Sequence, residues 1–307
     1  MKRFGQRQWA PYFFVGPFIL LFLTFGIFPI GFSFYLMFHI WDPVQGLGSM
    51  EYVGLENIWF AVEDPVVWTS LGNTIWLAVA SGVPQHLVAI PLAFIINERL
   101  GRFRNVAMGA YFLPYITSTV AIAIMFITLF SADYGAVNAI IGFLRESTFV
   151  GHFIPKENID WLGQPETIKP VIAIVVFWRY VGFNTILYVA ALQSIPRDLY
   201  EAAKLDGAST FKTFWYVTIP QLKPMMYFAV ILTLIGGLQL FEEPFILTGG
   251  KGGIEYSGMT TAMYMYRTAF EFSDYGLASA ISWILFILIV ILTILTNRAF
   301  KPRKSNV

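Results

Sequence analysis

The sequence contains no cysteine and few charged residues. The absence of cysteine from its 307 residues excludes a disulfide framework, an iron–sulfur cluster and a thiolate zinc site. Only 13% of the residues are charged, whereas a soluble domain carries about 25%. So few charges cannot cover a globular surface, and we expect most of the surface to face lipid. The net charge of +1, without a basic cluster interleaved with aromatic residues, argues against a nucleic-acid partner.

The chain instead contains long apolar runs, and 57% of its residues are hydrophobic. A membrane-spanning helix needs about 20 mostly apolar residues. Continuous runs of this length predict helices rather than barrel strands, which would alternate every second residue. The first run is too long for a signal peptide and has no small-residue cleavage site, so we expect it to be a retained span. We therefore predict an all-α polytopic membrane protein with six transmembrane helices, at residues 11–38, 70–96, 106–130, 171–193, 225–247 and 277–296.

Positive charges are distributed unevenly between the loops. Fourteen lysines and arginines lie in the N-terminal segment 1–10, the second loop, the loop 194–224 and the tail 298–307, against five in the other loops. The positive-inside rule places the first group in the cytoplasm, so both termini are expected there. The opposite side carries acidic and aromatic residues around positions 41–64, which favour either an interfacial belt or a docking surface for an external partner.

One stretch of the loop 194–224, YEAAKLDGASTFKTFWYVTIP, combines charge with helix signals. Pro196 is predicted to lie in the first turn of a helix that stops at Gly207. Ser209 can cap a second helix, expected over residues 210–219 and ended by prolines before the next span. The first helix has the spacing for Arg197–Glu201 and Glu201–Lys204 ion pairs. Such short helices are marginal in water, so the stretch either rests on the inner lipid surface or docks on a partner protein.

The same stretch resembles a family motif. The residues Glu201-Ala202-Ala203, followed by Gly207 and then by "VTIP" ending at Pro220, are similar to the EAA motif of permease subunits of bacterial ABC importers. The segments "FWRYVGF" and "LTGGKGG" resemble the sugar-importing branch that includes the maltose permeases. The matches lie mainly within residues 170–300. Lys251 stands where the branch usually has proline, and Val217 and Ile219 depart conservatively from the motif.

The resemblance implies a division of labour between subunits. The helix at the motif would be a coupling helix received by a cytoplasmic ATPase dimer, with the contact made by Glu201, Ala202, Ala203, Asp206 and Gly207. It also implies a second permease subunit, often non-identical, and an extracytoplasmic solute-binding protein at a bacterial inner membrane. The chain shows no nucleotide machinery, since "TGGKGG" lacks the spacing and the Ser or Thr of a P-loop. It is thus expected to bind no cofactor and to be no enzyme, because ATP and Mg²⁺ would be used by the ATPase.

Three residues with charged side chains lie inside the predicted spans. Arg179 is roughly 12 Å deep in the fourth span, and Glu242 and Glu243 are roughly 8 Å deep in the fifth, at about 1.5 Å per residue. Charges at such depths are costly and are functional hypotheses by default. We hypothesise that Arg179 pairs with one of the two glutamates in the outer half of the pathway. A purely structural ion pair or a snorkelling arginine is the alternative.

Sugars are bound by aromatic faces and planar polar groups, and the spans that flank the motif contain both. Likeness to the maltose permease implies that six of these residues lie at its sugar-holding positions: Trp178, Tyr180, Phe183, Thr233, Gly236 and Gly237. Asn184 and Gln239 are further candidates for the substrate pathway. Helix packing explains any one of them equally well. Gln85 and His86 in the second span are expected to form interhelical hydrogen bonds.

Together these patterns predict a permease subunit for a neutral oligosaccharide. A glycerol-3-phosphate permease would also look like this, but a phosphate ligand would need two or more cations in the pathway, and the spans offer only Arg179. A self-contained secondary transporter is expected to show inverted repeats or broken helices, and the sequence indicates neither. An intramembrane enzyme would need a catalytic constellation, and the sequence contains none of the familiar ones.

Overall fold

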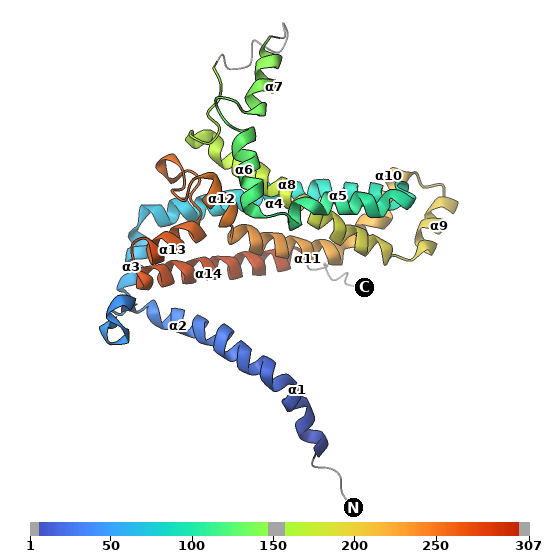
Figure 1. Cartoon of the computed structure of the whole chain (residues 1–307). Helices are drawn as coiled ribbons and strands as arrows, with labels where there is room; N and C mark the ends of the chain where they lie inside the picture. Colours follow the sequence, from blue (N-terminus) through green and yellow to red (C-terminus); the bar gives the residue numbers. More distant parts are fainter. Residues whose placement is uncertain (1–5, 147–156, 301–307) are drawn as a thin grey trace, which may run out of the picture. The chain divides into compact units, whose positions relative to one another are not determined.

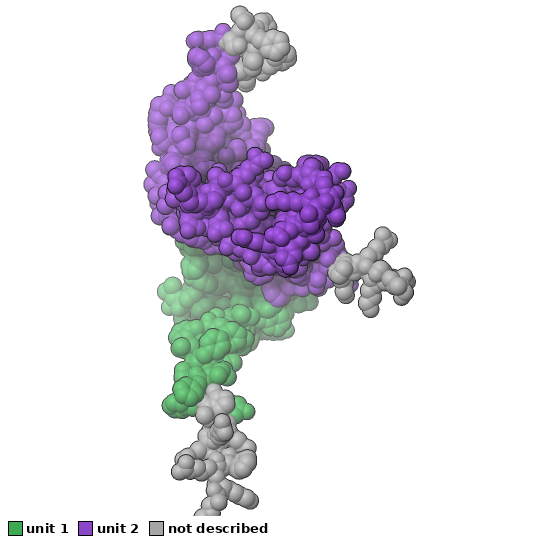
Figure 2. Space-filling view, turned by 90° about the vertical axis from the view of Figure 1, so that its right-hand side faces the viewer, with its two compact units in different colours: residues 1–65, 265–284 green, residues 66–264, 285–307 purple. Residues whose placement is uncertain are grey.

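The computed structural model describes residues 6–146 and 157–300 (Figure 1), so the outermost parts of the predicted terminal segments lie outside the described residues. The described chain is helical apart from one small antiparallel sheet of β1 (His39–Ile40) and β2 (Glu51–Tyr52), in which His39 pairs with Tyr52. Residues 1–65 and 265–284 form one compact unit, called unit 1, and residues 66–264 and 285–307 form unit 2 (Figure 2). The all-α fold class is confirmed.

Unit 1 contains the predicted first span. The span runs through α1 (Gln6–Phe22), a π-helical turn (Leu23–Ile27) and α2 (Phe28–Leu36). After two 3₁₀ turns (Pro43–Gln45 and Leu47–Ser49) and the sheet comes α3 (Glu56–Glu63). The buried Asn57 joins α3 to the end of α2, because its side-chain amide donates to the carbonyls of Met37 and His39, each at 3.1 Å.

Unit 2 contains the remaining helices, with α13 and α14 divided between the two units. Their bounds are α4 (Pro65–Arg99), a 3₁₀ turn (Gly101–Phe103), α5 (Arg104–Ile116), α6 (Thr119–Leu129), α7 (Ala136–Arg145), α8 (Pro165–Gln193), α9 (Arg197–Leu205), α10 (Thr210–Thr213), a π turn (Phe214–Thr218), α11 (Ile219–Leu238), α12 (Glu242–Leu247), a 3₁₀ turn (Ile254–Tyr256), α13 (Thr261–Phe270) and α14 (Tyr275–Phe300).

The six predicted spans correspond to five long apolar helical segments and one bent pair of helices. The five segments are Tyr12–Leu36, Pro65–Arg99, Pro165–Gln193, Thr210–Leu247 and Tyr275–Phe300. The third span is not continuous as predicted, because α5 and α6 meet at a 91° bend at residues 117–118. The fifth span is also interrupted, since α11 ends at Leu238 and α12 starts at Glu242. Broken helices are therefore present, and the prediction that there are none is wrong. This feature thus does not exclude a secondary transporter.

The loop 194–224 also differs from its prediction at its second helix. Residues 210–238 form one helical run from α10 through the π turn into α11, so neither Pro220 nor Pro224 ends the helix. Pro220 falls in the first turn of α11, where a proline is tolerated. Pro224 lies inside a helix of a membrane span, where neighbouring groups can satisfy the backbone carbonyl that proline leaves free. The cytoplasmic segment is thus a short helix attached to a long one.

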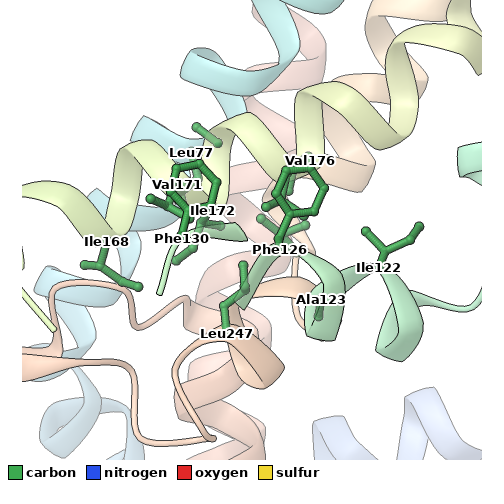
Figure 3. Packing of buried hydrophobic residues seen from close by; sticks show 13 residues of the cluster. Leu77, Ile122, Ala123, Phe126, Phe130, Ile168, Val171, Ile172, Val176 and Leu247 are labelled. Carbon is green, nitrogen blue, oxygen red and sulfur yellow. The ribbon is translucent and has the colours of Figure 1, made fainter. Parts of the chain in front are cut away.

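The core of unit 2 forms where α4, α6, α8 and α12 meet (Figure 3). Phe126 of α6 and Phe130, the C-cap residue of that helix, pack among the aliphatic side chains of α8, including Ile172 and Val176. Nearby, α5 and α8 approach so closely that a Cβ added at Gly182 would lie 1.7 Å from the carbonyl oxygen of Tyr111. Such backbone contact through a small residue is ordinary in membrane bundles. These contacts hold the helices that line the cavities described next.

Candidate functional site

Helix α9 begins at Arg197, so Pro196 is its N-cap and not part of its first turn as predicted. The helix ends at Leu205, and Gly207 follows the C-cap residue Asp206 as predicted, with a φ of +72°. The amide of Ala208 donates to the carbonyl of Ala203 at 2.9 Å, and that of Gly207 to the carbonyl of Lys204 at 3.0 Å. These two bonds form a Schellman motif, which favours glycine at this position. The predicted Ser209 cap is also present, since its hydroxyl accepts the amide of Lys212 at 3.4 Å.

The predicted contact face of α9 is uncovered. No residue of the helix is buried; Glu201, Ala202, Asp206 and Gly207 are exposed, and Ala203 is half-buried. Leu205 exposes 89% of its surface.

The predicted ion pairs of α9 are absent. Within the part of the chain that the structure describes, neither Arg197–Glu201 nor Glu201–Lys204 is among the ion pairs. Exposed pairs gain little over hydration, typically about 0–1 kcal/mol, so these side chains remain in water. The charges of α9 are thus free to meet another protein.

A cavity of about 370 Å³ lies between α4, α5, α8 and α11 in unit 2. Six of the predicted pathway residues line it: Tyr180, Phe183, Asn184, Thr233, Gly236 and Gly237. Trp178 does not line the cavity; its ring packs edge-on against Phe126 at 5.4 Å between centroids. Two residues along a helix are about 200° apart, so Trp178 and Tyr180 face opposite ways. Gln239 also lies outside the cavity, at the C-cap of α11.

The wall of this cavity has an aromatic part and a polar part. Tyr115 stacks on Phe183 with 4.6 Å between ring centroids and lies edge-on to Tyr180 at 5.7 Å. The side-chain nitrogen of Asn184 donates to Gln85 Oε1 at 2.9 Å, while Asn184 Oδ1, also buried, has no hydrogen-bond partner among the described residues. Buried acceptors normally have a partner. The cavity therefore combines aromatic faces with the polar Gln85–Asn184 pair.

Two of the polar contacts between helices are those the sequence predicts. Gln85 bonds Asn184 as above, and the hydroxyl of Tyr188 lies 2.8 Å from His86 Nδ1. Tyr115 and Ser81 also line the cavity but were not predicted. The hydroxyl groups of these two residues, within apolar spans, were a signal for ligand binding in the sequence. The predicted ligand residues came only from the two spans beside the EAA motif.

The predicted intramembrane ion pair is present, and its partner is Glu243. Arg179 Nη1 donates to Glu243 Oε1 at 2.6 Å, whereas the nearest oxygen of Glu242 is 3.9 Å away. The side chains of Arg179 and Glu243 expose only 11% and 3% of their surface, and that of Glu242 exposes 64%. The buried carboxylate thus neutralises the arginine and leaves the second carboxylate accessible.

Glu242 connects the two helix breaks. Its Oε2 accepts a hydrogen bond of 2.5 Å from the hydroxyl of Thr119. Glu242 is the first residue of α12 and Thr119 the first of α6, directly after the interruptions of the fifth and third spans. A second cavity of about 620 Å³ lies here, lined by Arg179, Glu242 and the hydroxyl-bearing Thr117 and Ser118. Its lining carries one cation and one exposed anion, with the second anion buried behind the cation.

A helical membrane protein with polar cavities between its spans and an exposed helix beside them is a membrane transport protein in its architecture. Residues 89–306 match the family of binding-protein-dependent transport system inner membrane components. The chain is 36% identical to a lactose transport system permease protein of Rhizobium radiobacter, over 95% of this chain and 94% of the relative. It is 32% identical to an arabinooligosaccharides transport system permease protein of Bacillus subtilis, over 95% and 89%.

The fold is shared with a solved structure. A bacterial ABC transporter involved in the import of the acidic polysaccharide alginate contains a chain that superposes with a TM-score of 0.81, at 23% identity and with 98% of each chain covered. On these matches the chain belongs to the family of inner membrane components of binding-protein-dependent transport systems. It is a multi-pass permease component and not the enzyme of its transport system.

Proposed function

We propose that the chain is the transmembrane permease subunit of an ATP-driven, binding-protein-dependent importer of a neutral oligosaccharide. Its partners would be a second, non-identical permease subunit, a cytoplasmic ATPase dimer that uses ATP and Mg²⁺, and an extracytoplasmic solute-binding protein. ATP hydrolysis would drive alternating access, and this chain would bind no cofactor itself. The permease would lie in the bacterial inner membrane. Both of its termini would be cytoplasmic, as the distribution of positive charges between the loops indicates.

The observation that carries the coupling role is the uncovered surface of α9. A nine-residue helix without a buried residue gains almost nothing from tertiary packing, and helices this short are marginal alone. Its exposed Leu205 lies beside the alanines and carboxylates that resemble the EAA motif. We infer that this surface, with Glu201, Ala202, Ala203, Asp206 and Gly207, is covered by the ATPase subunit.

The chemistry of the two cavities supports a neutral substrate. Tyr115, Tyr180 and Phe183 offer ring faces to a sugar, and the polar residues Asn184 and Thr233 lie in the same lining. In the cavity linings Arg179 is the single cation among the described residues, and Glu243 already neutralises it. A phosphate or carboxylate ligand would find no unpaired cation there and would meet the exposed Glu242. The names of the lactose and arabinooligosaccharide relatives agree with this substrate class.

The coupling role is tested by co-purification with the ATPase subunit. Glu201→Lys combined with Gly207→Pro reverses a charge on the contact face and removes the φ of +72° that Gly207 adopts, because proline fixes φ near −65°. We expect the variant to insert into the membrane at the parental level and to lose the ATPase. The matched control, Glu51→Lys, makes the same charge change at an exposed residue of β2 and should keep the ATPase. Retention of the ATPase by the double variant would refute the assignment.

A further inference from the structure

Helix α9 is joined to the rest of unit 2 by its chain ends, by packing on the neighbouring π turn (Phe214–Thr218) and by a hydrogen bond of one side chain. In the part of the chain that the structure describes, the side-chain hydrogen bond that leaves α9 is made by Tyr200, whose hydroxyl lies 3.3 Å from that of Thr218. Tyr200 is half-buried and α9 packs against the π turn that contains Thr218. The two chain ends are turns, at residues 194–196 and 206–209. Among the described residues, the hydroxyl pair is thus the side-chain hydrogen bond that links α9 to the long helical run, in addition to the packing of α9 on the π turn.

The hydroxyl of Thr218 differs in its partner from three other threonine hydroxyls within helices. Thr74, Thr185 and Thr213 each donate to the carbonyl four residues earlier, at 2.8, 2.8 and 3.1 Å. Thr218 is fully buried, with an exposed fraction of 0%, and its hydroxyl meets Tyr200 instead. A buried hydroxyl needs a partner, so this contact satisfies a group that would otherwise be unpaired.

The π turn accounts for the different direction. In it the amide of Ile219 bonds the carbonyl of Phe214, five residues back, so one extra residue is accommodated in the turn. Single π turns inside α-helices are rare and frequently lie at functional sites. This one is also fixed in the core, because Phe214 packs edge-on against Phe94 at 5.1 Å and Ile219 contacts a buried cluster of α4, α8 and α11.

The π turn is continuous with the helix that lines the first cavity. From Thr210 to Leu238 the backbone is helical without a break. Thr233, Gly236 and Gly237 near the far end line the cavity of about 370 Å³. A displacement applied to the π turn therefore acts on the first cavity through one rigid element.

We propose that the Tyr200–Thr218 hydroxyl pair transmits the movement of α9 to α11, which makes Tyr200 a positioning residue for the coupling of ATP hydrolysis to transport. The inference rests on the proposed function, in which the ATPase moves α9. Burial raises the pKa of the Tyr200 hydroxyl, the hydrogen bond to Thr218 opposes part of this shift, and the carboxylate of Glu98 adds a smaller increase. Without the bond, α9 can shift on its terminal turns while α11 stays in place.

The experiment measures transport and hydrolysis together in the complete transporter. The four variants are Tyr200→Phe, Thr218→Val, both together, and the control Thr213→Val. The control removes another buried hydroxyl of the same helical run, whose bond to Ser209 stays within its own turn. Proteoliposomes with the partner subunits are loaded with ATP, and uptake of radiolabelled neutral di- and trisaccharides is divided by the phosphate released.

We expect each single variant to keep the ATPase and to lower the uptake per ATP hydrolysed roughly threefold to tenfold, as loss of a hydrogen bond worth about 0.5–1.5 kcal/mol would. The double variant should lose no more than either single one, since both remove the same contact. Thr213→Val should stay at the parental ratio. An unchanged ratio in Tyr200→Phe, an additive double variant, or an equal loss in Thr213→Val would overturn the inference. Failure of the parental chain to bind the ATPase would instead overturn the proposed function.

Discussion

Replacing Glu243 by glutamine removes the charge that compensates a buried arginine. Arg179 is 2.6 Å from Glu243, and the two side chains expose only 11% and 3% of their surface. Breaking a buried ion pair by removing one partner typically destabilises a protein by about 3–5 kcal/mol, because the remaining charge is uncompensated. Glu242, at 3.9 Å from Arg179, can recover part of this loss. We therefore expect Glu243→Gln to lower stability by about 3 kcal/mol, the lower end of that range.

Glu242 provides the matched control at the next position. The change Glu242→Gln removes a carboxylate that exposes 64% of its surface and leaves the buried pair intact. Exposed ion pairs contribute about 0–1 kcal/mol, so the expected loss is at most about 1 kcal/mol. A third variant, Arg179→Met with Glu243→Leu, removes both charges at once. Apolar replacement of a whole buried pair is often neutral or stabilising, so this variant should be more stable than Glu243→Gln.

The assay is thermal unfolding of the purified chain in one detergent, followed by intrinsic tryptophan fluorescence at a fixed heating rate. The predicted order of midpoints is parental, then Glu242→Gln, then Glu243→Gln, with the double-charge deletion above Glu243→Gln. A parental midpoint for Glu243→Gln would refute the argument that a buried charge is left uncompensated. A lower midpoint for Glu242→Gln than for Glu243→Gln would show that the arginine pairs with the other glutamate.

Three glycines give predictions that separate transport from folding. A Cβ at Gly236 would meet no atom within 4 Å, so the Gly236→Leu variant should assemble normally. Its leucine should fill the cavity and abolish oligosaccharide uptake into proteoliposomes. Normal uptake would contradict the assignment of this cavity to the substrate pathway. At Gly237 an added Cβ comes 3.0 Å from that of Ala78, so Gly237→Leu should also lower the unfolding temperature, which Gly236→Leu should leave unchanged. At Gly182 the added Cβ would lie 1.7 Å from the carbonyl oxygen of Tyr111. Gly182→Ala should therefore lower the amount of the protein in the membrane, measured on an immunoblot. An amount equal to that of the parental protein would contradict the close packing of α5 and α8.

Most of the spans and the helix at the EAA-like stretch could be predicted from the sequence because each has a strong local signal. Apolar runs longer than 20 residues define spans, and Gly207 with its positive φ marks the end of α9. The depth of Arg179 and of the two glutamates also predicted their pairing. Which glutamate is the partner could not be read, since neighbouring residues point about 100° apart and the direction of α12 depends on the break before it.

The breaks and the cavity depend on contacts between distant segments. The bend at residues 117–118 lies in a run that is apolar on both sides, so composition does not mark it. The hydrogen bond between Thr119, next to the bend, and Glu242 joins positions that are 123 residues apart. The sequence prediction ended the second helix of the loop 194–224 at Pro220, because a proline often ends a helix. In the structure the helical run from α10 continues through Pro220 into α11. Tyr115 was missed because its place beside Phe183 follows from the packing of α5 on α8, which no local pattern specifies.

We propose that this chain transports an oligosaccharide only as part of an ATP-driven complex. The direct test reconstitutes the chain in proteoliposomes, alone and with the second permease, the ATPase and the solute-binding protein, and measures uptake of radiolabelled neutral di- and trisaccharides with and without ATP. We expect saccharide uptake only from the complete complex with ATP. Saccharide uptake by the purified chain alone, without the ATPase, would contradict it.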